Sequence, residues 1–91
     1  RPAAAFLDYA RLVPPLVVRS IRPGDRMGPL GLGGTKKLQD LLTDDKVPRP
    51  NRRRLPILED GCSILWIAGG RIAERGRVAP ETTVILRVEI V

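Results

Sequence analysis

Two short apolar runs that flank Asp60-Gly61 constrain the fold of this chain more than any other feature. The first run is Ile-Leu-Glu at 57–59, and the second is Ser-Ile-Leu-Trp-Ile at 63–67. An Asp-Gly pair between such runs is a strong signal for a β-hairpin. Because the second run is apolar on both faces, we expect its strand to be central in a sheet, with Trp66 in the core rather than on a base-stacking surface.

Further strands are indicated on both sides of this hairpin. Residues 16–22 are rich in β-branched side chains and half polar, which predicts a first strand. A Pro23-Gly24-Asp25 turn follows, in which we expect the Asp25 carboxylate to cap the turn and to pair with an arginine. Residues 83–91 alternate between apolar and charged side chains, which is the pattern of a strand with one face in solvent.

One principal helix is predicted, and with it an α+β fold. Leu38, Leu41 and Leu42 share one face of a helical pattern from about residue 36 to about residue 46, with Thr35 as its N-cap. The elements together predict a small, mostly antiparallel sheet of about four or five strands, packed against this helix through its leucines.

The start of the chain differs in character from the rest. Residues 1–15 combine a short helical piece with a Pro14-Pro15 stop, so we interpret them as a linker or the tail of a preceding element. The domain itself is then expected to span 16–91. The chain opens at Arg1 rather than at methionine, which suggests a domain of a longer protein.

The charges of the predicted helix run against its dipole. Lys36 and Lys37 fall in the first turn, and Asp44 and Asp45 fall in the last, an order that forfeits roughly 0.3–1 kcal/mol per charge. A glycine-rich loop precedes the helix, with glycines at 28, 31, 33 and 34. An anion such as phosphate at the helix N-terminus would explain this arrangement. The alternative is a flexible loop followed by two solvated lysines, because the glycine spacing matches neither a dinucleotide fingerprint nor a P-loop.

A second group of cations follows the helix. Such a tract is usually a solvated face, but two prolines stiffen this one and apolar strands enclose it, so we expect an ordered, basic surface. Two further arginines lie around the first turn, and all these cations could form one patch. The candidate phosphate-binding residues are therefore Lys36, Lys37, Lys46, Arg49, Arg52, Arg53, Arg54, Arg22 and Arg26.

The composition excludes several classes of function. The 91 residues carry 16 Lys+Arg against 10 Asp+Glu, a formal charge of +6, which favours polyanionic partners such as nucleic acid. Histidine is absent and Cys62 is the single cysteine, so we predict no catalytic residues, no metal site and no disulfide, in keeping with a reducing cytoplasm. No apolar run approaches the roughly 20 residues of a membrane span. The chain has only three aromatic residues, which favours contact with a nucleic-acid backbone over base stacking.

Several ordered motifs resemble the C-terminal domain of bacterial tRNA(Ile)-lysidine synthetase. They are RPGDR at 22–26, the KKLQDL helix, the DKVPR segment, the basic stretch before Leu-Pro, and W-x-x-G-x-RI in the segment 64–78. The resemblance covers roughly residues 19–78. The chain departs from it at Leu42, where phenylalanine is frequent, and at Ala68, where proline is frequent, and neither position belongs to the basic patch.

The resemblance implies a function and a set of partners. The parent enzyme is an ATP-dependent ligase that uses ATP and Mg²⁺ to adenylate the wobble cytidine of an isoleucine tRNA and then attaches lysine. That chemistry belongs to a separate N-terminal domain, so this chain is expected to need no cofactor and to be inactive alone. The C-terminal domain would help to hold tRNA(Ile) on its acceptor-stem side, beside the catalytic domain of the same protein, in the cytoplasm and away from membranes.

The resemblance also implies a fold, and an alternative function stays open. The fold is expected to resemble a small domain of the phenylalanyl-tRNA synthetase β-subunit. The alternative function is an architectural or dimerisation module of the same enzyme with no direct RNA contact, in which the positive charge mainly aids solubility; a homodimer is compatible with either reading.

Overall fold

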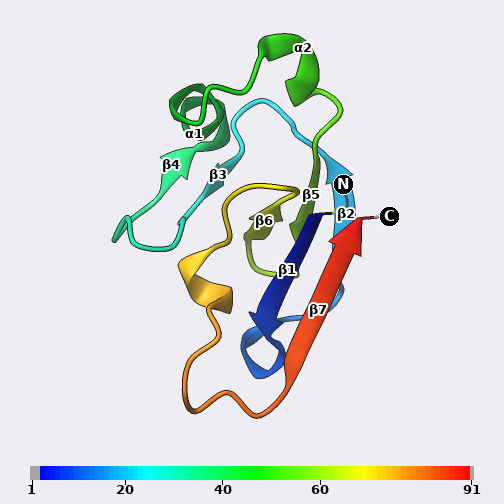
Figure 1. The fold of residues 1–91 in the computed structure, drawn as a ribbon, viewed down its shortest axis with the longest axis vertical. Helices are drawn as coiled ribbons and strands as arrows, with labels where there is room; N and C mark the ends of the chain where they lie inside the picture. The colour runs from blue at the N-terminus through cyan, green and yellow to red at the C-terminus, as the bar shows by residue number, and fades with distance from the viewer. Residues whose placement is uncertain (1–2, 91) are drawn as a thin grey trace.

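The computed structural model describes residues 3–90, which form a small α+β domain (Figure 1). Its strands are β1 (Ala3–Asp8), β2 (Val17–Ser20), β3 (Arg26–Met27), β4 (Lys36–Lys37), β5 (Pro56–Glu59), β6 (Ile64–Ile67) and β7 (Ile85–Ile90). Its helices are α1 (Leu38–Asp44) and α2 (Arg49–Arg52), and two 3-10 turns are η1 (Tyr9–Arg11) and η2 (Glu74–Gly76). The predicted α+β class is confirmed, but within residues 3–90 the strands are divided among three small antiparallel sheets instead of one.

The predicted hairpin forms the middle of the domain. Strands β5 and β6 pair antiparallel on either side of Asp60-Gly61, with Leu58 opposite Trp66. The sheet order is β2-β5-β6, so the expectation that the second run is the central strand is wrong: β5 is central. Strand β6 is nevertheless buried along its whole length. The chain turns back after β6 and covers its outer edge, where Ile72 forms a bridge with Trp66.

Two hydrophobic clusters explain why β6 is apolar on both faces. On one face, Ile64 and Ile67 join the first cluster, which contains the three leucines of α1. On the other face, Leu65 and Trp66 join the second cluster, which contains side chains of β1 and β7. The strand therefore lies between two small cores, and the prediction that Trp66 is buried is confirmed, since 3% of it is exposed.

The N-terminal segment is a strand, which corrects the expected helical piece. Strand β1 pairs antiparallel with β7 in a register that places Phe6 opposite Arg87 and Leu7 opposite Leu86. Leu7 is completely buried in the second cluster. The alternation predicted for the last strand is confirmed, because Leu86, Val88 and Ile90 are its more buried positions. The expected division of the chain at residue 16 stays a prediction.

The principal helix is shorter than predicted and begins later. Strand β4 contains Lys36 and Lys37, which pair with Met27 and Arg26 of β3 in an antiparallel ribbon. Lys37, not Thr35, is the N-cap residue, and it caps with its backbone alone. The sequence pattern misplaced this boundary because the periodicity of the leucines begins only at Leu38, while pairing with β3 decides the conformation of the two lysines.

Candidate nucleic-acid interface

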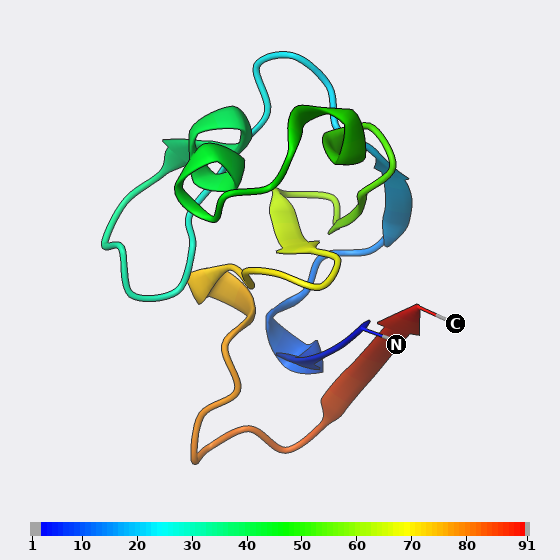
Figure 2. The same ribbon diagram turned by 45° about the horizontal axis from the view of Figure 1, so that its top comes forward.

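Helices α1 and α2 and the turn at 21–25 lie at one end of the domain (Figure 2). Residues of these segments line a basic cleft. Its volume is about 410 Å³. Four apolar side chains contribute to its lining, namely Ile21, Pro23, Leu38 and Leu42. Five cations surround it, namely Arg22, Lys37, Arg49, Arg52 and Arg53. A cleft lined by one sign of charge focuses the electrostatic field and attracts anions.

Backbone and side-chain hydrogen bonds hold the walls of the cleft together. The Leu38 N–H at the start of α1 donates to the Asp25 carbonyl oxygen at 3.0 Å, which ties the turn to the helix. On the other wall, Arg52 donates through Nε to the Val47 carbonyl oxygen at 3.0 Å and through Nη2 to Thr43 Oγ1 at 3.2 Å. These two bonds fix α2 against the C-terminal end of α1. The cleft is therefore built from ordered elements.

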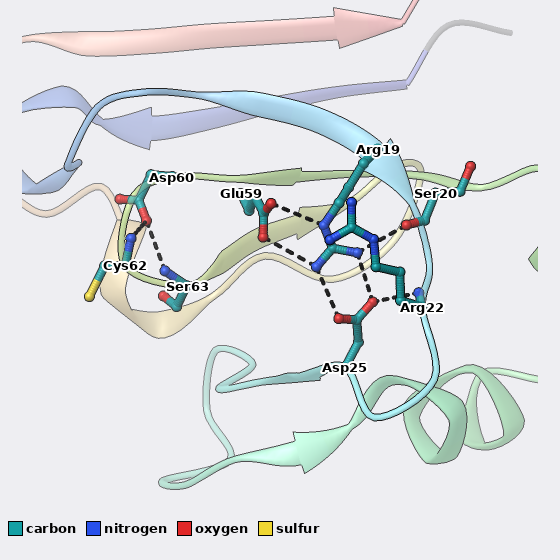
Figure 3. A network of polar contacts seen from close by, with 8 residues as sticks. All are labelled: Arg19, Ser20, Arg22, Asp25, Glu59, Asp60, Cys62 and Ser63. Atoms are coloured by element: carbon teal, nitrogen blue, oxygen red, sulfur yellow. Dashed lines mark hydrogen bonds and ion pairs between the residues drawn. The ribbon is translucent and has the colours of Figure 1, made fainter.

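Arg19 of β2 links the turn to β5 by binding the carboxylates of Asp25 and Glu59 (Figure 3). Its guanidinium donates to both oxygens of Asp25, each at 2.9 Å, and to both oxygens of Glu59 at 3.0 and 3.2 Å. The Asp25 carboxylate also accepts the Arg22 N–H at 2.7 Å, so it caps its turn and pairs with an arginine as predicted. The hydrogen bonds from Arg19 lower the pKa of Asp25 against the opposing effect of burial.

The pairing with Arg19 matters for the electrostatics of the cleft. Asp25 lines the cleft and would repel an anion if its charge were uncompensated. Arg19 partly compensates this charge from the interior, since its guanidinium is shared with Glu59 and only 12% of its side chain is exposed. Sequence reasoning did not single out Arg19. Its position after two valines in a half-polar strand, six residues before Asp25, was the available signal.

The structure brings five of the nine predicted cations together and leaves four outside the cleft. Lys36 pairs with Asp44 at 2.5 Å. Arg26 lies against Thr35, with donor–acceptor distances of 3.3 to 3.4 Å. Lys46 and Arg54 are exposed on the connections that flank α2. Among the described residues, Lys36 is the one member of the nine that forms an ion pair.

The glycine-rich loop does not form the phosphate cradle that its composition suggested. Its backbone is bound to the η2 region: Leu30 N–H donates to Ile72 O at 2.9 Å, and Glu74 N–H donates to Gly28 O at 2.8 Å. The Gly31 N–H donates to a carboxylate oxygen of Glu74 at 3.3 Å. Because an acidic side chain already occupies this backbone, the loop is a poor site for a second anion.

Ion pairs compensate three of the four charges that oppose the helix dipole, and Lys37 is the fourth. Asp44 at the C-terminal end of α1 pairs with Lys36, and Asp45 receives two hydrogen bonds from Arg71 at 2.6 and 2.8 Å. The bonds from Arg71 lower the pKa of Asp45. The proposed anion at the helix N-terminus is therefore not needed to explain the charge order, and α1 is too short to support that explanation.

The remaining sequence features lie away from the cleft. Phe6 and Tyr9, both about half exposed, belong to β1 and η1. Cys62 is a free, exposed thiol beside the hairpin turn. Within residues 3–90, no helix is long and apolar enough to cross a membrane.

The fold and the cleft together define a small, basic α+β domain with a cation-lined cleft at one end. A family model described as "TilS substrate C-terminal domain" matches residues 16–90. The chain therefore belongs to the TilS C-terminal domain family, as its motifs indicated.

Relatives of known description agree with this assignment. The chain is 39% identical over 84 residues to the tRNA(Ile)-lysidine synthase of Caldanaerobacter subterraneus and 46% identical over 85 residues to that of Symbiobacterium thermophilum. These matches cover 92% and 93% of the chain but 18% of each relative. A crystal structure of a TilS C-terminal domain superposes with a TM-score of 0.79 at 37% identity, covering 96% of this chain and 68% of that one.

Proposed function

We propose that this domain binds tRNA(Ile) through the phosphates that face its basic cleft, as part of a tRNA(Ile)-lysidine synthase whose catalytic site lies in another domain. The observation that carries the proposal is the convergence of five cations from three separate segments on one cleft. Each segment alone is unremarkable, since exposed arginines are usually solvated. Their convergence concentrates positive charge on a concave surface, which is what attraction of an RNA backbone requires.

The cations differ in how available they are to a phosphate. Arg22, Lys37, Arg49 and Arg53 have exposed side chains and form no ion pair with any residue of 3–90. They are the residues that we assign to phosphate contact. Lys36 is held by Asp44, so its contribution should be smaller. We retain Lys46, Arg54 and Arg26 as outer contacts that would extend the footprint beyond the cleft.

The catalytic chemistry is assigned elsewhere. The relatives are named tRNA(Ile)-lysidine synthases. We propose that ATP and Mg²⁺ act in a separate N-terminal domain of such an enzyme, as the family resemblance implies. Within residues 3–90, no three His, Cys, Asp or Glu side chains lie together as a set of metal ligands. We propose, from the family resemblance, that this chain acts in the cytoplasm by holding the substrate and has no ligase activity alone.

An architectural role is the second candidate, and one surface favours it. Phe6 on β1 and Ile85 on β7 are 53% and 52% exposed on the β1–β7 ribbon, away from the cleft. Such side chains suit contact with another protein domain or a second copy. This role and RNA binding use different surfaces, so they can be separated experimentally.

The test compares two triple variants with the same loss of charge. In the first, Lys37→Gln, Arg49→Gln and Arg53→Gln remove cations from the cleft. In the matched control, Arg11→Gln, Arg77→Gln and Arg87→Gln remove three from elsewhere. Affinity for a tRNA(Ile) transcript is measured by fluorescence anisotropy at low salt.

We expect the cleft variant to bind at least about 10-fold more weakly than the control. Equal weakening in both variants would mean that net charge, not the cleft, governs binding. Undetectable binding of the unaltered chain would favour the architectural role.

A further inference from the structure

The cleft has a property that contact with phosphates alone does not require, namely an apolar lining. Its lining includes Leu38 and Leu42 of α1, of which 0% and 3% are exposed, and the more exposed Ile21 and Pro23 of the turn. A double-stranded backbone is convex and fully hydrated, so a flat basic surface is enough to bind it. A concave site that combines apolar side chains with polar and charged ones is instead typical of a pocket for a small, partly apolar group.

We propose that the cleft takes one unpaired nucleotide, with its base inside and its phosphates on the cations at the rim. This inference rests on the proposed RNA-binding function and specifies which part of an RNA enters the site. The volume of about 410 Å³ falls within the range of about 300–1,000 Å³ that ligand pockets occupy. Bases of unpaired nucleotides can be splayed out of the strand and inserted in this way, whereas paired bases cannot.

Arg52 supplies the stacking surface that the scarcity of aromatic residues seemed to exclude. Guanidinium planes can stack on bases in place of aromatic rings. The two hydrogen bonds to Val47 O and Thr43 Oγ1 fix the plane of this guanidinium, and its side chain is half-buried in the wall of the cleft. Pro23 offers a rigid apolar surface in the same cleft. An arginine held in this way suits a base better than a mobile one, because less side-chain freedom is lost on binding.

The rim also contains cations for the phosphates of such a nucleotide and an amide for the edge of its base. Arg49 begins α2 and Arg53 directly follows it, while Arg22 and Lys37 belong to the turn and to β4. Phosphates on either side of the base would meet these cations. Gln39 is the uncharged polar side chain of the lining, and its amide can both donate to and accept from the edge of a base.

The test uses RNA hairpins that differ only at their single-stranded end. One has an ordinary 3′ tail, one has a tail whose bases are replaced by abasic sites, and one is blunt. The abasic tail retains every phosphate, so it separates stacking from charge. Because stacking of a base contributes substantially, the abasic tail should bind about 5- to 100-fold more weakly than the intact tail.

Arg52→Lys locates the effect in the cleft. The variant retains the charge but loses the planar guanidinium and its two fixing bonds, so it should bind intact and abasic tails with nearly equal affinity while keeping the salt dependence of the unaltered chain. Its thermal unfolding curve checks that the domain is folded. If it is not, the same comparison is made with Gln39→Leu, for which a reduced preference for the intact tail is expected.

The possible outcomes distinguish this inference from the function on which it rests. Equal affinity of the unaltered chain for intact and abasic tails would overturn the nucleotide pocket and leave phosphate binding in place. Retention of the full preference by the folded Arg52→Lys variant would also overturn it, since the base would then lie elsewhere, for example on the exposed Phe6 or Tyr9. Failure of all three hairpins to bind would refute the proposed function itself.

Discussion

Replacing Arg19 with glutamine should destabilise the domain strongly, although the residue lies outside the cleft surface. Its guanidinium forms four hydrogen bonds of 2.9 to 3.2 Å with two carboxylates. The Asp25 side chain is 13% exposed and the Glu59 side chain 27%, so removing their partner leaves two poorly hydrated charges. Breaking a fully buried pair costs about 3–5 kcal/mol, and because water reaches Glu59 we expect a loss of about 2–4 kcal/mol in the free energy of unfolding.

Urea denaturation followed by the fluorescence of Trp66 measures this loss. Trp66 is the single tryptophan and is buried in the second cluster, so its emission should report global unfolding. Arg87→Gln is the matched control, because Arg87 makes an equally bidentate pair with Glu89 at the surface, where the side chains are 56% and 34% exposed. The control should lose less than about 1 kcal/mol. If Arg19→Gln also lowers the free energy of unfolding by less than about 1 kcal/mol, the hydrogen bonds from Arg19 do not stabilise the turn.

The pH dependence of the Arg19→Gln effect provides an independent check. Since hydrogen bonds from Arg19 lower the folded-state pKa of Asp25, its contribution to stability is present above the unfolded-state value of about 4 and is lost as the pH falls through the folded value. In the variant, acid protonates the unpaired carboxylate and removes its desolvation penalty. The difference between the two proteins should therefore be largest near neutral pH and should narrow below about pH 4. A difference in unfolding free energy that stays constant across this pH range would contradict the stabilising role of the Arg19–Asp25 pair.

Two further substitutions test the packing and the hairpin turn. Gly76→Ala should lower the free energy of unfolding by about 1–3 kcal/mol, because the added Cβ would lie 2.9 Å from Leu7 Cδ2 in the second cluster. Gly34→Ala is the control, since its Cβ would have nothing within 4 Å, and it should change this free energy by less than about 0.5 kcal/mol. Equal effects of the two substitutions in urea denaturation would mean that the site at Gly76 can relax. Asp60→Asn should cost about 2–4 kcal/mol near neutral pH, because burial raises the pKa of Asp60 but hydrogen bonds from Arg75 and three backbone N–H groups outweigh it and lower that pKa. Because this contribution is lost on acidification, the unfolding free energies of the two proteins should converge below about pH 4 in urea denaturation at successive pH values. A variant as stable as the unaltered chain at neutral pH would rule out this role of the Asp60 carboxylate.

Local sequence patterns predicted several elements correctly, whether or not their pairing partner is close in sequence. The Asp60-Gly61 hairpin, the alternation of β7 and the burial of the α1 leucines were all correct, because turn chemistry and side-chain periodicity determine them locally. Strand β1 was missed because its partner β7 lies at the other end of the chain. The sheet order was also missed, because a strand between two cores has the same apolar pattern as a central strand.

The candidate site was only partly accessible from the sequence. The basic residues around the turn and after the helix could be named, but their convergence on one cleft depends on the hydrogen bond between Leu38 and Asp25 and on the docking of Arg52. The charge order of the helix led to a wrong explanation, because the acidic partner of Lys36 lies eight residues later and Arg71 lies in a different segment. Long-range ion pairs of this kind leave no local signal.

The salt dependence of tRNA binding tests the central claim most directly. Each phosphate contact that a cation makes adds about 0.7–0.9 to the slope of log K against log salt concentration. The account predicts that the triple variant of Lys37, Arg49 and Arg53 lowers this slope by about 2 to 3, while the control triple variant of Arg11, Arg77 and Arg87 leaves it within about 0.5 of the unaltered chain. An unchanged slope in the cleft variant, or an equal decrease in the control, would show that the cleft does not hold the RNA backbone.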